Sequence, residues 1–517
     1  MKTIFKYVFS FALGVGVFAS CDLDTIPTTY VDAGSVFGKT GDAEKVLNGG
    51  WNYLMESFNS YANPGFGSVL RCNDAMGCDV VLNNKYGFNK HNQFNSIYTK
   101  SGTNSWAWLL PYRVINDCNG VLGNIDAAEG TQAERDRIKG QALALRGFLY
   151  MHLASSFSFA IDKDPDAVCA PIYTESTDVT IASEGKPASS VSEVYAQAIS
   201  DLEEALDLIP ESYVRNSKHK IDNEVVLGIL SRACLYARQW EKAKMYSDQL
   251  LAKDNYLMTE SEYNDGFSTV DNKEWIWGHP QTNDQANASY QFHFLDTTTK
   301  GSYYYSFNVD PYFRDLFDEG DYRKKMMFWA TDPGADVESA AYVWMRHSKF
   351  RFRDIENQLA DIVLMRVSEI YLINAEAKAR LNDPDAVNKL NALKTARGAK
   401  TIDAGLSQQD LLEAIWLERR KELWGEGFAL VDIVRNQQTV VRKAYPEDPI
   451  DYTYTDDNGK THTLKKKTQG HRYFTFPDQS EFCANSKYYL YRIPDSEETA
   501  NKNIYKDHPQ LSIYKDE

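Results

Sequence analysis

Apolar residues recur at helical spacing in several separate stretches of the chain. In one of them Ile138, Ala142, Leu145 and Leu149 follow one another at intervals of three or four residues. This spacing places the four side chains on one face of an α-helix. The same pattern predicts further helices over residues 42–58, 108–125 and 191–209. The chain is therefore expected to be mainly α-helical.

Two later stretches predict helical hairpins, each made of a striped helix, a short break and a second stripe. In residues 226–250 the second stripe begins at Trp240, and in residues 367–393 an Asn-Asp-Pro turn separates the stripes. Small alanines such as Ala233 and Ala375 lie on the facing sides, which is typical of tetratricopeptide-like units. Generic antiparallel helices remain an alternative to such units.

Between the helical stretches, residues 61–103 and 255–350 have no clear period. Long irregular segments in compact proteins often carry function, so these two regions are the first places to look for a binding site. Residues 274–277 alternate like a short strand, which favours a core position for Trp275 and Trp277. Residues 303–305 and 350–353 could form further strands. Near the end, Asn458-Gly459 between alternating threonines predicts a β-hairpin over residues 452–463.

Charge and composition narrow the function. The 517 residues carry a net charge of −16, which argues against nucleic acid as a partner because phosphates need a basic surface. Aromatic residues make up 13% of the chain and include 32 tyrosines. Tyrosine joins an apolar ring to a polar tip, which suits a surface that binds a partly polar ligand.

The N-terminus has the features of a bacterial lipoprotein signal. Lys2 and Lys6 precede a short apolar run, and the run ends at Ala19-Ser20-Cys21. A dozen apolar residues are too few to span a membrane but suffice for a signal peptide. We therefore expect a signal peptide at residues 1–20, lipidation of Cys21, and a tether over residues 21–40 that anchors the protein to outer-membrane lipid. An ordinary cleavable signal is the alternative.

The remaining cysteines form no CxxC motif, so a zinc ribbon or a thioredoxin-type site is not expected. Cys72 and Cys78 could pair across a loop in an oxidising compartment. Buried free thiols are the simpler interpretation and the one we favour.

Motifs for catalysis and cofactors mostly fail. The chain has no HExxH and no GxSxG, and its nine histidines are scattered. The Asp-Asp-Asn-Gly loop at residues 456–459 hints at a calcium site but lacks a ligand, because Lys465 stands where a carboxylate is needed. Glu418, Arg419 and Glu422 lie close together on a predicted helix, where an ion network that fixes two helices is the expected role. We therefore predict no enzymatic activity, no cofactor and no metal.

Four blocks of sequence stand out from the rest of the chain. One is Cys21 followed by Asp-Leu-Asp-Thr-Ile-Pro, and a second, over residues 366–377, has the pattern R-x-x-E-x-Y-L-x-x-A-E-A. A third, over residues 418–435, contains ERRKEL and then EG, and a fourth begins with Tyr491-Arg-Ile-Pro. In these blocks the chain resembles the SusD/RagB family of outer-membrane nutrient-binding lipoproteins of Bacteroidetes.

The resemblance implies a mainly α-helical, SusD-like fold, in which four tetratricopeptide-like helical hairpins support an irregular, loop-rich ligand-binding half with a few short strands and hairpins. It divides the mature chain into an N-terminal part, residues 41–215, and a C-terminal part, residues 216–517. It also implies a partner, a TonB-dependent (SusC-like) outer-membrane receptor, over which the lipoprotein sits as a lid. The protein would then lie at the cell outer membrane, lipid-anchored and facing the outside. The ligand would be an oligosaccharide or, as in RagB-like proteins, a peptide, and an enzyme or a helical scaffold is the remaining alternative.

A sugar ring stacks its apolar CH face on an aromatic ring, while its hydroxyls need planar polar partners. We therefore place the candidate glycan-binding residues in the two irregular regions. They are Tyr61, Phe66, Asp74, Tyr86, Phe88 and Asn89 in the first region, and Tyr290, Phe294, Tyr303, Tyr304 and Trp344 in the second.

Overall fold

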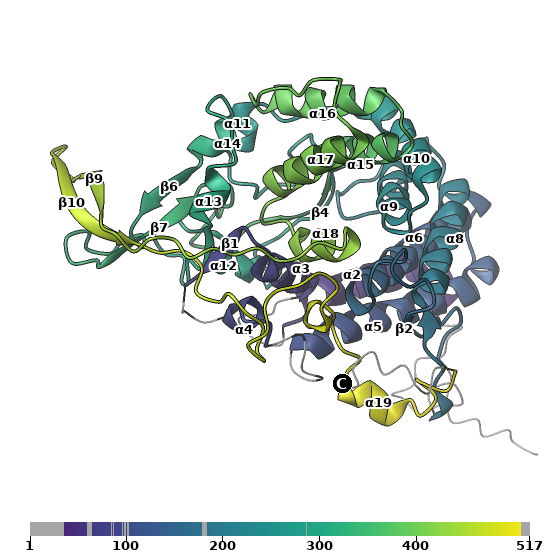
Figure 1. Cartoon of the computed structure of the whole chain (residues 1–517). Helices are drawn as coiled ribbons and strands as arrows, with labels where there is room; N and C mark the ends of the chain where they lie inside the picture. Colours follow the sequence, from purple (N-terminus) through teal and green to yellow (C-terminus); the bar gives the residue numbers. More distant parts are fainter. Residues whose placement is uncertain are drawn as a thin grey trace, which may run out of the picture.

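The computed structural model describes residues 36–58, 65–83, 85, 87–95, 97, 100, 103–177, 183–285 and 287–507. The predicted signal peptide, Cys21 and most of the tether lie outside these residues. Long helices occupy one side of the molecule, and most of the strands lie on the other (Figure 1). A mainly α-helical fold with a loop-rich part is thus confirmed.

The long helices, with the exception of α3, follow the predicted stripes closely. They are α2 (Thr40–Glu56), α3 (Gly65–Met76), α5 (Thr103–Asn124), α6 (Gln132–Phe157), α8 (Val191–Leu208), α9 (Asn223–Tyr236), α10 (Trp240–Lys253), α15 (Val367–Arg380), α16 (Asp385–Ala396) and α17 (Gln408–Glu422). Shorter helices are α4 (Asn89–Asn92), α11 (Glu260–Tyr263), α12 (Phe292–Leu295), α13 (Pro311–Arg314), α14 (Tyr322–Lys325), α18 (Ala429–Arg435) and α19 (Asp495–Ala500). Within the described ranges no helix is both long and apolar enough to cross a bilayer.

Consecutive long helices pack side by side as hairpins. α5 packs on α6, α9 on α10 and α15 on α16, while α6 with α8 and α10 with α15 join one pair to the next. The turns are tight: Arg238 between α9 and α10 and Asn382 between α15 and α16 both have a positive φ, 59° and 56°. Short connections of this kind make neighbouring helices antiparallel. The predicted tetratricopeptide-like hairpins are confirmed.

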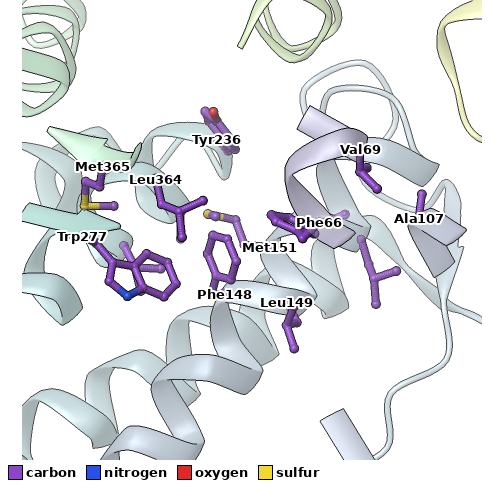
Figure 2. Close-up of a cluster of buried hydrophobic side chains, with 14 of the residues drawn as sticks. Phe66, Val69, Ala107, Phe148, Leu149, Met151, Tyr236, Trp277, Leu364 and Met365 are labelled. Carbon is purple, nitrogen blue, oxygen red and sulfur yellow. The ribbon is translucent and has the colours of Figure 1, made fainter. Parts of the chain in front are cut away.

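The core joins the helical side to the strands (Figure 2). Phe148 of α6 contacts Trp277 of β4 (Trp275–His279) edge to face, with ring centroids 4.8 Å apart. Phe66 of α3 contacts the same Phe148 ring at 5.6 Å. β4 pairs antiparallel with β8 (Ile362–Arg366), and all five β4 residues are buried. The core position predicted for Trp275 and Trp277 is therefore confirmed.

Part of the first irregular region is helical, which corrects the sequence-based expectation. α3 lies inside residues 61–103, and it is buried on nearly every side. Its polar residues hydrogen-bond to the chain after α17, where Asp74 accepts from the Gly427 amide at 2.8 Å and Asn73 donates to the Gly427 carbonyl at 3.3 Å. α3 is only 12 residues long and contains two glycines, an asparagine and an aspartate, which have low helix propensity, so the sequence pattern did not reveal it.

The strands form small sheets. β6 (Met327–Ala330), β7 (Tyr342–His347), β10 (Thr461–Thr468) and β9 (Ile450–Thr455) form a four-stranded sheet in that order. The predicted hairpin is confirmed as β9–β10, and it projects well beyond the body of the molecule (Figure 1). The other pairs are β1 (Val80–Leu82) with β5 (Phe307–Val309) and β2 (Val168–Ala170) with β3 (Ser189–Ser190). The prediction of strands at residues 303–305 and 350–353 was wrong, because both segments are irregular in the structure.

A buried ion network holds the C-terminal helices to the strands. Glu422 on α17 pairs with Arg323 at 2.7 Å, and with Arg366 and Arg397 at 2.9 Å each. Around these four residues the pairs continue, so that five cations and five carboxylates are linked in the described part of the chain. The remaining members are Lys349, Lys394, Asp321, Glu274, Glu418 and Glu426. The ion network predicted for Glu418, Arg419 and Glu422 is confirmed, with Arg419 pairing separately to Asp432 of α18 at 3.1 Å.

The thiols of Cys72 and Cys78 are both free, as the simpler interpretation held. The Cys72 sulfur lies 3.1 Å from Nε2 of His91, and the Cys78 sulfur accepts the amide hydrogen of Val441 at 3.2 Å. Burial raises the pKa of each thiol, so both are held protonated.

Candidate ligand-binding site

Three tyrosines of the second irregular region gather at the surface and form what we call the platform: Tyr290, Tyr303 and Tyr304. Tyr290 belongs to η2 (Ala288–Gln291), and the other two follow α12 in the irregular segment that leads to β5. Tyr303 is the most open of the three, with 51% of its surface exposed. Tyr290 and Tyr304 are half-buried.

Each of the last two platform rings rests on a buried ring. Tyr303 stacks on His293 with centroids 4.0 Å apart and an interplanar angle of 6°. Tyr304 stacks on Phe294 at 4.4 Å and 14°. Because His293 covers one face of Tyr303 and half of the residue is exposed, the opposite face is available for stacking. Burial lowers the pKa of His293 to about 4, so the supporting imidazole is neutral at physiological pH.

Backbone hydrogen bonds fix the platform in place. The His293 carbonyl accepts from the amides of Tyr304 and Tyr305 at 3.1 and 3.2 Å. Asn83, which directly follows β1, donates its side-chain amide to the carbonyls of the same two residues at 2.9 and 3.2 Å. Tyr305 has a φ of 47°, an uncommon conformation that turns the chain between the platform and β5. Such fixed rings lose little conformational freedom when they bind a ligand.

The η2 segment is attached to the C-terminus of α2 through Glu56. This buried carboxylate accepts from the Ala288 amide at 3.1 Å and from the Gln281 side chain at 2.7 Å, and it lies 2.6 Å from Nε2 of His279. Trp51 donates to the other ring nitrogen of His279 at 3.0 Å. The tryptophan donor leaves Nε2 as the protonated nitrogen, so the imidazole donates to Glu56. Tyr290 is thereby held at a set position beside Tyr304.

Polar groups border the platform. Nε2 of Gln358 lies 3.4 Å from the Tyr303 hydroxyl, and Gln358 itself has a φ of 57°. Lys85 sits over the ring of Tyr305, 4.9 Å from its centroid, and pairs with Asp332 at 2.8 Å. Phe58 adds an exposed ring edge to face against Tyr290 at 6.2 Å. The site thus combines apolar ring faces with an amide and a charged pair.

The structure separates the predicted site residues into three groups. Tyr290, Tyr303 and Tyr304 come together, whereas Tyr61 and Tyr86 lie outside the described residues. Phe66, Phe88, Phe294 and Asp74 are at most 2% exposed, so in this structure they pack in the core and have no surface for a ligand. Burial raises the pKa of Asp74 to about 6. Asn89 and Trp344 are half-buried, and their contacts are with other residues than the three tyrosines. Asn89 donates a hydrogen bond to the Lys85 carbonyl, and the Arg472 guanidinium lies over the Trp344 ring.

Sequence reasoning missed His293, Phe58 and Gln358. His293 lies between two chosen aromatics in the sequence, so its proximity to them was a usable signal. Phe58 ends a predicted helix and Gln358 lies in a short turn, and neither has a pattern that marks it. Among the described residues no group of three or more His, Cys, Asp or Glu side chains is arranged to hold a metal ion.

Comparison with known proteins identifies two family matches. Residues 339–510 match the model described as "SusD family", and residues 43–235 match one described as "Starch-binding associating with outer membrane". Over 405 residues the chain is 24% identical to a SusD-like protein of Formosa agariphila, which covers 67% of this chain and 75% of that protein.

Solved structures extend the likeness to almost the whole chain. A SusD-like carbohydrate binding protein from Bacteroides vulgatus is 84% identical, with a TM-score of 0.91 over 93% of this chain and 100% of that chain. A putative sugar binding protein from the same species is 25% identical, with a TM-score of 0.71 over 91% of this chain and 98% of that one. By both its family-model matches and its near-complete likeness to a solved relative, the chain belongs to the SusD family.

Proposed function

We propose that this protein binds oligosaccharides or polysaccharides without covalent chemistry at the outer membrane and delivers them to a TonB-dependent (SusC-like) transporter. The observation that carries the binding role is the Tyr303 ring, which is half exposed and held flat against His293 at 4.0 Å. A fixed aromatic face beside polar side chains suits a sugar ring, whose CH groups stack while its hydroxyls hydrogen-bond. The family description of starch binding at the outer membrane supports the same ligand class.

Delivery and anchorage rest on other features. Cys21 would supply the acylation site that holds the protein at the membrane, and residues 21–40 would supply the tether. The net charge of −16 disfavours polyanionic ligands, because a strongly acidic protein repels them. The exposed aromatic rings are therefore the feature from which we infer the ligand class. Tyr290, Tyr303 and Tyr304 are the residues we assign to the glycan, and Asn89, Trp344, Tyr61 and Tyr86 remain proposals for a longer ligand.

The test is retardation of the purified protein in native gels that contain different polysaccharides, followed by calorimetry with oligosaccharides of the retarding polymer. Tyr303→Ala removes the open ring, and the loss should be roughly ten- to thirty-fold in affinity, in the range of a central aromatic contact. Tyr342→Ala is the matched control, because Tyr342 is also an exposed tyrosine (42%) but lies on β7 outside the platform. Neither change should lower the melting temperature by more than about 1 °C, because both sites are exposed.

Two results would contradict the proposal. Equal retardation of Tyr303→Ala and of the unchanged protein would remove the platform as the binding site. Binding of peptides in place of every glycan tested, again through Tyr303, would keep the platform but transfer the protein to the peptide-uptake alternative.

A further inference from the structure

A cavity lies at the opposite end of β1 from the platform. It encloses about 360 Å³, within the range of small-molecule sites. Its walls come from α17, α18, the segment that follows α18, and the residues just before β1. Asp79 borders the cavity and Asn83 holds the platform, and these two residues flank β1, about 13 Å apart along the chain at strand spacing.

The charged groups of this cavity are already neutralised by one another. Arg420 makes two hydrogen bonds to Asp79, at 2.6 and 3.0 Å. Asp432 accepts from Arg419 at 3.1 Å and from Arg435 at 2.6 Å. A ligand with a net charge would have to compete with these pairs, at a cost that a partly buried site does not recover easily. The cavity therefore favours a neutral ligand.

The unused hydrogen-bonding capacity belongs to neutral amides. Both side-chain polar atoms of Asn436 are buried and have no hydrogen-bond partner in the described part of the chain. Gln438, a half-buried residue, lines the cavity with a second carboxamide. An unpaired buried amide costs free energy that a ligand could recover by pairing with it. Each carboxamide offers one acceptor and two donors, the set that neighbouring hydroxyls require.

The rest of the wall is apolar. Trp416 and Ile433 line the cavity, and Val441, 56% exposed, lies at its opening. Arg380 lies over the Trp416 ring, 5.6 Å from its centroid. A neutral ligand for this cavity thus needs one apolar surface for the indole and side chains around it, and several hydroxyls for the amides.

From these features we infer that the cavity is a second carbohydrate site, which takes a single neutral sugar residue against Trp416 and pairs its hydroxyls with Asn436 and Gln438. On binding, Asn436 turns its amide toward the cavity that its side chain already lines. The site is independent of the platform, since it shares no residue with it. The terminal sugar of a glycan chain and a free monosaccharide would present the same hydroxyls and apolar face to the cavity. The experiment below distinguishes these two ligands.

The experiment is saturation-transfer NMR on the full mature protein, with glucose, galactose, mannose and galacturonate as the probes, and with a trisaccharide of each neutral sugar as the chain-end probe. The variants are Asn436→Ala/Gln438→Ala, which removes the amides, and Val441→Trp, which narrows the opening from an exposed position. Gln409→Ala on the exposed side of α17 is the matched control. Circular dichroism melting of each variant verifies that it folds.

We expect at least one neutral sugar to bind the unchanged protein, Gln409→Ala and Tyr303→Ala alike, and to lose at least ten-fold in affinity in both cavity variants. Binding of the trisaccharide but not the monosaccharide assigns the site to chain ends. No saccharide binding to Tyr303→Ala, unchanged binding in both cavity variants, or a preference for galacturonate would each overturn the inference. The two proposals can fail separately. If Tyr303→Ala loses polysaccharide retardation and no monosaccharide binds the protein, the platform is supported and the cavity site is not. If Tyr303→Ala keeps its retardation and a monosaccharide binds in the cavity, the cavity site is supported and the platform is not.

Discussion

Replacing Glu422 by glutamine tests the buried ion network most directly. The substitution keeps the shape of the side chain but removes the charge that pairs with Arg323, Arg366 and Arg397 at 2.7 to 2.9 Å. The three guanidinium groups and the carboxyl group have no side-chain exposure above 2%. With five cations and five carboxylates in the network, the change leaves one buried positive charge in excess.

Removal of one partner from a buried pair costs about 3–5 kcal/mol, because the remaining charge is left uncompensated. Unfolding entropies near 2.1 cal/mol/K per residue give a chain of this length about 1 kcal/mol/K. We therefore expect Glu422→Gln to lower the melting temperature by about 3–5 °C in differential scanning calorimetry. Glu413→Gln, an exposed position on the same helix, is the control and should change it by less than about 1 °C.

The pH dependence gives a second measurement on the same pair of proteins. The surrounding arginines outweigh desolvation and hold the pKa of Glu422 well below its usual value of 4.5. A carboxyl group with a depressed folded pKa contributes stability that is fully present above the unfolded pKa and is lost as the pH falls toward the folded one. The difference in stability between the unchanged protein and Glu422→Gln should therefore be constant above about pH 5 and shrink below pH 4.5. A melting difference no larger than that of Glu413→Gln, or one that grows on acidification, would refute the reasoning.

Three further predictions follow from single positions. Gly65→Ala should lower the free energy of unfolding in urea by about 2–3 kcal/mol, because Gly65 has a φ of 56° and a Cβ there would lie 1.8 Å from the Met55 carbonyl oxygen. An unchanged urea midpoint would contradict this close approach. Among the thiols from residue 72 onward, exposed Cys483 alone should react quickly with a thiol reagent in the native state, and rapid labelling of a second thiol would show that the core opens. In Glu376→Gln the free energy of unfolding should fall less steeply between pH 4.5 and pH 2 than in the unchanged protein, since Arg435 lowers the pKa of this buried carboxyl group to about 2. An acid unfolding curve identical to that of the unchanged protein would contradict the pairing.

Long helices with apolar residues repeated over several turns were predictable, and a short helix rich in glycine and polar residues was not. The stripe that begins at Ile138 runs over about three turns and lies in α6, where Ile138, Ala142, Leu145 and Leu149 are all buried. α3 spans only 12 residues, which include two glycines and the polar Asn73 and Asp74, and such residues have low helix propensity. Asn73 and Asp74 are buried because they hydrogen-bond to Gly427. The partners of α3 lie about 350 residues away in the sequence, beyond the reach of local patterns.

The ion network shows the same limit from another side. Glu418 and Glu422 are four residues apart on one helix face, so their common role was visible. Arg366, Arg397 and Glu274 come from separate segments and meet Glu422 only in the folded chain. The sequence therefore predicted that a network exists, but not which groups neutralise it.

The platform is the sharpest case, because its residues are neighbours in sequence yet differ in access to solvent. Phe294 and Tyr304 form one stacked pair, in which Phe294 is fully buried and Tyr304 is half-buried. Composition favours both as ligand contacts, and only the stacking order decides which ring faces outward. The chemistry agrees with that order, since a phenylalanine loses nothing by full burial whereas the tyrosine hydroxyl needs a partner, which Tyr290 offers at 3.4 Å. An outward tyrosine backed by an inward phenylalanine or a neutral histidine is thus a more specific indication of a stacking surface than aromatic density, and it explains why Tyr303 and Tyr304, but not Phe66 or Phe88, remain in the proposed site.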